Sequence, residues 1–144
     1  MSHHVRDACL CLHVQRTARA LARRFDEAFR PLDLTSGQFS LLVSLNRPNP
    51  PNIGSVASLL AMDRTTLTAA LKPLERRGLI DVRIDAKDRR TRLLKLTRKG
   101  RTLLSRAVPI WKSTHTGLEK QLANADPERL RSDLHVLSGS GNSG

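Results

Sequence analysis

The sequence predicts a mainly helical fold that carries one small β-hairpin, and three observations support that prediction. Apolar residues recur at helical spacing through most of the chain, and capping residues, glycines or prolines separate the helical stretches. The segment that alternates as strands do lies between residues 79 and 97. The length of 144 residues is that of one ordinary domain.

The first half of the chain predicts three helices. Apolar positions such as Phe25 and Phe29 form a stripe on a long helix over residues 7–32. Thr35, with Gln38 three residues later, is typical of a capping box and begins a second helix through Leu45. The prolines within residues 47–52 predict a loop. Residues 53–62 follow as a short helix, whose inward side chains we expect to be Val56, Leu59 and Leu60.

The second half predicts a further helix, the hairpin and two more helices. A helix from about residue 64 to 77 ends before Gly78, which suits a left-handed C-terminal cap. Residues 79–84 and 91–97 read as two strands joined by a polar turn. Thr97 begins a long helix that Pro109 should kink, and Asp126 with Pro127 begins the last helix.

Positive charge is concentrated in one part of the chain. The formal net charge is +12, from 25 Lys and Arg against 13 Asp and Glu. Residues 63–101 alone hold thirteen basic and five acidic residues. Aromatic residues make up only 3% and tyrosine is absent, so a surface that binds single strands by base stacking lacks its side chains. The composition therefore favours double-stranded DNA as the partner.

The charged segment has the order of a helix-turn-helix followed by a wing. A short helix, a turn, a second helix and a hairpin succeed one another, and the second helix exposes Thr, Arg and Lys, which can donate hydrogen bonds in a major groove. Arginines at the hairpin tip are placed to reach an adjacent minor groove.

Four segments of the chain closely resemble the MarR (multiple antibiotic resistance regulator) family. They are DRTTLT at 63–68, KPLERRGLI at 72–80, DAKDRR at 85–90 and LTRKG at 96–100. The resemblance implies a winged helix-turn-helix transcription regulator that binds a pseudopalindromic operator as a homodimer. It implies a dimerisation helix in residues 1–34, a DNA-binding domain in 35–100 and dimerisation helices in 101–138. The Gly and Ser residues at the end of the chain predict a disordered tail in 139–144.

The same resemblance assigns the DNA-binding side chains. Asp88 would orient Arg90 at the wing tip, whereas Arg76 and Arg77 could equally contact DNA or complement the end of their helix. The residues expected to contact DNA are Arg64, Thr65, Thr66, Thr68, Lys72, Arg76, Lys87, Arg89 and Arg90.

Two triggers for releasing DNA remain open at this stage. A small-molecule effector could bind between the dimerisation helices and the DNA-binding domain, in a pocket lined by Phe25, Phe29, Phe39 and Trp111. Alternatively, Cys11 falls where the organic-hydroperoxide-sensing branch of the family keeps its reactive cysteine, although the tyrosines of that branch are missing here.

Cys9 is a second redox candidate beside Cys11. On one continuous helix the two side chains would point about 200° apart, which disfavours a bond between them or a shared metal.

The remaining expectations concern what the protein lacks. No catalytic grouping, phosphate loop or metal-ligand spacing is evident, so we expect no enzymatic activity, cofactor or bound metal. Without an apolar run long enough to span a bilayer, we expect a cytoplasmic protein with no membrane partner. A repressor released by a small molecule is the main interpretation; a non-specific architectural DNA-binding protein would carry the same charge and is the remote alternative.

Overall fold

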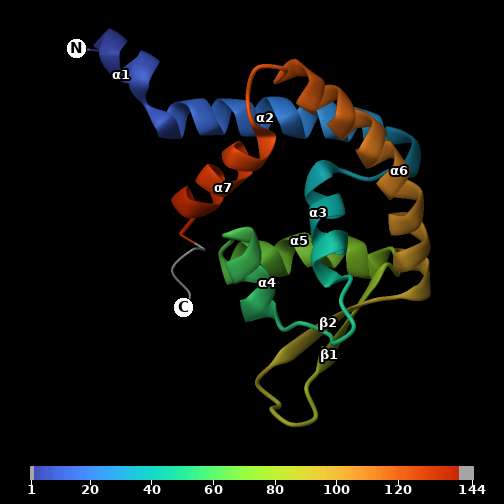
Figure 1. Ribbon diagram of the computed structural model, residues 1–144. Helices are drawn as coiled ribbons and strands as arrows, with labels where there is room; N and C mark the ends of the chain where they lie inside the picture. The colour runs from blue at the N-terminus through green and yellow to red at the C-terminus, as the bar shows by residue number, and fades with distance from the viewer. Residues whose placement is uncertain (1, 140–144) are drawn as a thin grey trace.

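The computed structural model describes residues 2–139 and confirms a mainly helical fold with one hairpin (Figure 1). The elements, in chain order, are α1 (Ser2–Ala8), α2 (Leu10–Phe29), the 3-10 turn η1 (Arg30–Leu32), α3 (Ser36–Leu45), α4 (Ile53–Leu60), α5 (Arg64–Arg76), β1 (Ile80–Ile84), β2 (Arg92–Leu96), α6 (Arg98–Gln121) and α7 (Pro127–Leu137).

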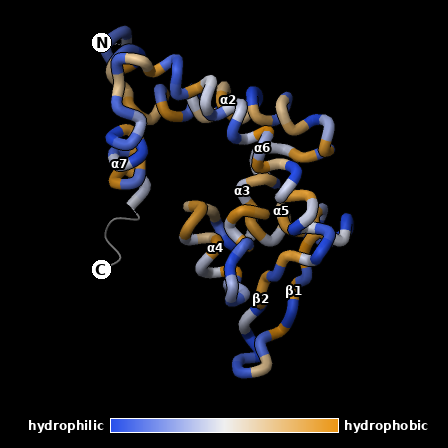
Figure 2. Tube along the Cα trace, turned by 45° about the vertical axis from the view of Figure 1, so that its right-hand side comes forward, coloured by the Kyte–Doolittle hydropathy of each residue, from blue (hydrophilic) through white to orange (hydrophobic). Residues whose placement is uncertain are grey.

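One long helix lies above a smaller lobe and a second runs along its side. Figures 1 and 2 show α2 above α3, α4, α5 and the hairpin, while α6 rises from the hairpin along the side of the lobe and packs against α2, with the hairpin loop at the far end. Helix α7 turns back beneath α2, and Leu130 and Leu134 of α7 line a cavity with Thr17 and Leu21 from the middle of α2. The arrangement separates a pair of long helices from the lobe that carries the predicted DNA-binding residues.

The hydrophobic core lies where the end of α2 meets the lobe. Phe29, Leu42, Leu67 and Leu94 are among its fully buried side chains, from α2, α3, α5 and β2. By contrast, α1 and α7 contain no buried residue. The lobe therefore has its own core, whereas the two terminal helices are largely uncovered in the single chain.

The long first helix was predicted as continuous and is in fact broken at Cys9. That residue is extended (φ −70°, ψ 110°), and its sulfur accepts a hydrogen bond from the backbone N–H of Leu12 at 3.4 Å. The thiol thus acts as an N-cap and begins α2. At the other end Pro31 belongs to η1 rather than to the helix, and Asp33 follows in the left-handed region (φ 51°).

The predicted helix starts are confirmed at three other positions. Thr35 and Gln38 form both hydrogen bonds of a capping box. The Thr97 hydroxyl accepts from the N–H of Gly100 at 3.0 Å. Asp126 caps α7, with Pro127 as its first residue. Capping depends on residues three apart in sequence, which is why sequence alone predicted it.

One expected core residue of α4 is exposed. Val56 is fully buried as predicted, but Leu59 is 58% exposed and Ala57 is buried instead. Because α4 packs against α3, α5 and β2 along the line of Val56 and Ala57, Leu59 lies on its outer flank.

The hairpin is antiparallel and pairs Ile80 with Leu96 and Ile84 with Arg92. Gly78 precedes it with φ 72°, as the predicted left-handed cap requires. The loop over 47–52 is confirmed, and its Pro51 carbonyl also accepts from the N–H of Leu94 at 2.8 Å, which ties the loop to β2. Helix α6 continues through Pro109 and bends along its length (Figure 1). The predicted disordered tail, 139–144, lies outside the described residues except for Gly139.

Candidate nucleic-acid interface

The turn between α4 and α5 sets how α5 is presented. Ala61 ends α4 in the left-handed conformation (φ 52°), and its N–H donates to the carbonyls of Ala57 and Ser58. Asp63, in an extended conformation, begins α5 two residues later. Together α4 and α5 form the predicted helix-turn-helix.

Helix α5 has one buried face and one exposed face. Leu67, Leu71 and Leu74 are at most 3% exposed and hold the helix against the core. The predicted DNA-contacting residues of this helix are all exposed, namely Arg64, Thr65, Thr66, Thr68, Lys72 and Arg76. Fixing the apolar face on the core leaves these donors free to enter a groove.

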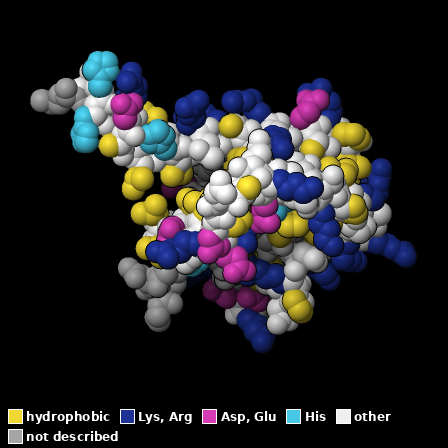
Figure 3. All heavy atoms as spheres, turned by 45° about the horizontal axis from the view of Figure 1, so that its top comes forward, with side chains coloured by type: hydrophobic (Ala, Val, Ile, Leu, Met, Phe, Trp, Pro, Cys, Tyr) yellow, Lys and Arg dark blue, Asp and Glu magenta, His cyan; other side chains and the backbone are white. Residues whose placement is uncertain are grey.

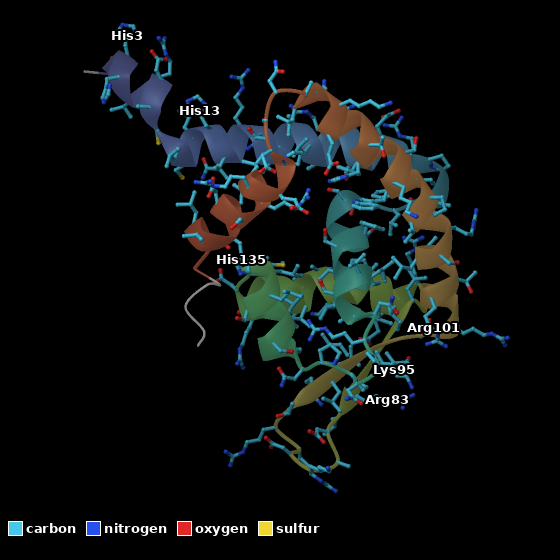
Figure 4. All side chains as sticks on the ribbon, in the orientation of Figure 1. His3, His13, Arg83, Lys95, Arg101 and His135 are labelled. Atoms are coloured by element: carbon cyan, nitrogen blue, oxygen red, sulfur yellow. The ribbon has the colours of Figure 1, made fainter. Side chains whose placement is uncertain are left out.

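The hairpin separates apolar and charged side chains by strand alternation. Asp81 pairs with Lys95 across the strands, and Arg83 lies two residues from Asp81 on the same face. Figure 4 shows Arg83 and Lys95 near the point where the hairpin meets Arg101 of α6. Because Asp81 forms an ion pair with Arg83 at 3.7 Å, part of this charge is neutralised within the strand.

The loop at the hairpin tip is shaped by two carboxylates. Asp85 accepts a hydrogen bond from the N–H of Lys87 at 2.9 Å. One oxygen of Asp88 accepts from the N–H of Arg90 at 3.1 Å, and the other from the Thr91 hydroxyl at 3.0 Å. Asp88 therefore holds the backbone of Arg90 rather than its guanidinium. The side chains of Lys87, Arg89 and Arg90 are exposed.

A cavity of about 310 Å³ lies between the start of α4, helix α5 and the hairpin, or wing. We call it the α4–α5–wing cavity. Its lining combines two predicted DNA-binding arginines, Arg64 and Arg90, with Arg92 from β2 and with Asn52 and Gly54 at the start of α4. Sequence reasoning missed Arg92, Asn52 and Gly54, because no local pattern indicates that the start of α4 and the wing converge.

Arg77 has a structural partner. Its guanidinium donates to the backbone carbonyl of Asp33 at 2.6 Å and to that of Leu32 at 3.4 Å. Its own carbonyl accepts from the Lys99 ammonium at 2.9 Å. Arg77 thus joins the end of α5 to η1 and to the start of α6, while contact of Arg77 with DNA stays a prediction.

The two cysteines lie where α1 ends and α2 begins. Cys9 is half-buried and Cys11 is exposed, and both are free thiols. Because Cys9 precedes α2 instead of lying within it, the helical angle expected between the two side chains does not apply. Redox activity of either residue stays a prediction.

Three of the four aromatic residues proposed for an effector pocket, Phe25, Phe29 and Phe39, pack as neighbours. Phe29 is fully buried, with ring centroids 6.0 Å from Phe25 and 4.7 Å from Phe39. Trp111 stacks on His115 at 4.8 Å. Their role in effector binding stays a prediction.

A more apolar cavity, of about 300 Å³, lies between α2, α6 and α7. Leu21, Leu118 and Leu130 are in its lining, which includes none of the four aromatic residues. Sequence reasoning missed it, since only folding brings α7 back to α2.

Two other kinds of site are absent from residues 2–139. In that range no three His, Cys, Asp or Glu side chains are grouped so that they could hold a metal ion. None of the described helices is both long and apolar enough to span a bilayer.

Known proteins resemble both the sequence and the fold. The model of the MarR family matches residues 34–91. The organic hydroperoxide resistance transcriptional regulator of Bacillus subtilis (strain 168) is 30% identical over 128 residues, or 89% of this chain and 86% of that protein. The M. tuberculosis transcriptional regulator MosR, crystallised with DNA, has 33% identity and a TM-score of 0.77 over 94% of this chain and 97% of that one. The repressor CouR of Rhodococcus jostii RHA1, bound to a 23-mer DNA duplex, has 28% identity and a TM-score of 0.76 over 96% of both chains.

Proposed function

The chain belongs to the MarR family, and from that premise we propose that it is a DNA-binding transcription regulator that represses by occupying a pseudopalindromic operator as a homodimer. The observation that carries the proposal is the exposed Thr, Arg and Lys face of α5 beside the basic wing tip. A recognition helix reads base edges in the major groove, while the wing adds contacts beside it. The residues we propose for these contacts are those expected from the sequence, with Arg77 assigned a structural role.

Dimerisation is supported by the apolar side chains that the single chain leaves exposed. Figure 3 shows hydrophobic side chains gathered near the N-terminal helices and α7. Leu10 and Val14 of α2 are 65% and 43% exposed, and Val136 and Leu137 of α7 are 68% and 63% exposed. A monomer rarely leaves such a patch uncovered. We propose that residues 1–34 and 101–138 of two copies cover one another, with residues 35–100 as the DNA-binding domain.

Release from DNA requires a ligand that binds one conformation better than another. The cavity between α2, α6 and α7 supports a small apolar effector, because it lies among the helices that set the distance between two recognition helices in such a dimer. An effector can shift the equilibrium away from the DNA-bound state only if it binds more tightly to the dimer when its two α5 helices are at a spacing that does not fit the operator.

The proposed function predicts a large specificity ratio. Titrating the protein onto the DNA upstream of its own gene, and onto random DNA of equal length, should give affinities that differ by roughly 10³-fold or more. Fluorescence anisotropy at two fixed salt concentrations measures both. Equal affinities for the two duplexes would instead identify a non-specific architectural protein.

A thiol trigger is the second candidate, and the position of the cysteines favours it. Cys11 is exposed, so an organic hydroperoxide in solution can reach its thiol, and Cys9 lies two residues away. An organic hydroperoxide would oxidise a thiolate to the sulfenic acid and leave as the alcohol. The hydroperoxide-resistance function of the B. subtilis relative points the same way.

Cys11→Ser tests this trigger. We expect stoichiometric organic hydroperoxide to release the wild-type protein from its upstream DNA and a thiol reductant to restore binding. The Cys11→Ser variant should bind this DNA with wild-type affinity both before and after treatment with the oxidant. The Cys9→Ser variant, in which a hydroxyl can keep the cap of α2, shows whether the second thiol takes part in the response. If the wild-type protein binds equally well before and after oxidation, the trigger is a ligand.

A further inference from the structure

The α4–α5–wing cavity gathers positive charge without any acid. Arg64 comes from α5, Arg90 from the hairpin loop and Arg92 from the start of β2, and no Asp or Glu belongs to the lining. The ion pairs formed within residues 2–139 use other arginines. Three guanidinium groups around one cavity repel each other unless an anion lies among them.

The start of α4 adds to this positive potential. The first N–H groups of a helix have no partner within the helix and carry the positive end of its dipole. Asn52 caps the N–H of Ser55 at 2.7 Å, while Ile53 and Gly54, the first two residues of α4, line the cavity. Cations are normally disfavoured at such a helix end, so the presence of Arg64 beside it indicates an anionic ligand.

Gly54 provides the space in which the Arg64 guanidinium lies. A Cβ built on Gly54 would be 2.7 Å from Nη2 of Arg64, closer than real contacts allow, and 3.3 Å from Cζ, so the flexible end of the Arg64 side chain would have to shift. Any side chain at position 54 must therefore displace this guanidinium. Glycine is also less favourable than alanine within a helix, by about 0.5–1 kcal/mol, so helix stability does not explain it.

We propose that the α4–α5–wing cavity binds one phosphate group of the operator backbone, and that Gly54 is the positioning residue that seats the Arg64 guanidinium against that phosphate. A DNA phosphate fits better than a free anion because the cavity is open and lies between the two elements that contact DNA in the proposed function, on which this inference rests. Contacts to phosphate fix the register in which α5 reads the bases.

Gly54→Ala tests the seating of Arg64, and Gly37→Ala is its matched control. Both glycines are the second residue of a helix, but a Cβ at Gly37 would meet nothing closer than the Thr35 hydroxyl at 4.0 Å. We expect Gly54→Ala to weaken operator binding about tenfold for each occupied half-site. The slope of log affinity against log salt should become shallower by about 0.9 per half-site. Gly37→Ala should bind as the wild type does.

A double-mutant cycle with Arg64→Ala shows whether Gly54 acts through Arg64. Arg64→Ala should match Gly54→Ala in affinity and salt slope, and the double variant should bind no more weakly than either single variant. Additive losses, or a weakened Gly54→Ala protein with an unchanged salt slope, would overturn the proposal. So would wild-type binding by Gly54→Ala when Arg64→Ala is impaired. If the wild-type protein does not bind its upstream DNA more tightly than random DNA, the proposed function itself is wrong, whatever the role of Gly54.

Two further experiments, which do not use Gly54→Ala, identify whether the phosphate belongs to the DNA backbone or is a free anion. Operator duplexes with a neutral methylphosphonate at one backbone position at a time should reveal a position that weakens wild-type binding but not binding by Arg64→Ala. Inorganic phosphate, compared with chloride at equal ionic strength, should not reduce operator affinity. If no methylphosphonate position distinguishes the two proteins, or if free phosphate competes at millimolar concentration, the cavity does not serve the DNA backbone.

Discussion

Replacing Gly100 with alanine is expected to lower the free energy of unfolding by about 2–3 kcal/mol, although alanine is the better helix former. A Cβ on Gly100 would lie 2.1 Å from the backbone oxygen of Leu79 and 3.1 Å from its carbonyl carbon. Leu79 is buried, and this same oxygen accepts from the N–H of Thr97 at 3.0 Å. The contact is with backbone, so the start of α6 must move away from the hairpin. Thermal unfolding should show a fall in Tm of about 5–10 °C.

The control for Gly100→Ala is Gly37→Ala, which adds the same methyl group to the first turn of α3 in open space. There we expect no loss, and a gain of up to about 1 kcal/mol. If both variants are equally stable, the close approach of α6 to Leu79 is not a constraint on this fold. A loss of stability in Gly100→Ala alone would also explain the glycine of the LTRKG segment, because only glycine lets α6 begin against the hairpin.

Arg90→Ala is expected to weaken operator binding about 10- to 100-fold for each half-site, the value of a hydrogen-bonded charge at an interface. Arg90 is exposed at the wing tip, and Asp88 fixes its backbone through the N–H at 3.1 Å. A charged side chain in a minor groove interacts with its phosphate-lined walls, so the salt slope should also become shallower. Anisotropy titrations at several salt concentrations measure both quantities.

Thr68→Ala provides the contrast for Arg90→Ala. The Thr68 hydroxyl carries no charge and lies on the exposed face of α5, so its loss should weaken binding to the operator more than to random DNA. Arg90→Ala should weaken binding to both duplexes. An Arg90→Ala protein with unchanged affinity and unchanged salt slope would show that the wing tip does not contact DNA.

Local chemistry explains which elements were predictable. The capping box of Thr35 and Gln38, the left-handed Gly78 and the proline after Asp126 act over a few residues, so their signals are complete within the sequence. The sequence did not predict the helix break at Cys9, because the apolar periodicity runs across it and a thiol is an uncommon cap.

The DNA-binding face was also largely predictable, for a different reason. Once Leu67, Leu71 and Leu74 are assigned to the core, helical geometry leaves Thr65, Lys72 and Arg76 on the opposite side.

By itself, the sequence determined the order of the elements, the winged helix-turn-helix, the family and the concentration of positive charge, because periodicity, caps and composition are local properties. Only the tertiary structure decided that Arg77 binds the carbonyl of Asp33, that Arg64 occupies the space above Gly54, and that Gly100 lies against Leu79. Each of these contacts joins residues at least ten positions apart, on different elements. Their geometry depends on how the helices pack around a shared core, and no pattern within one segment encodes that packing.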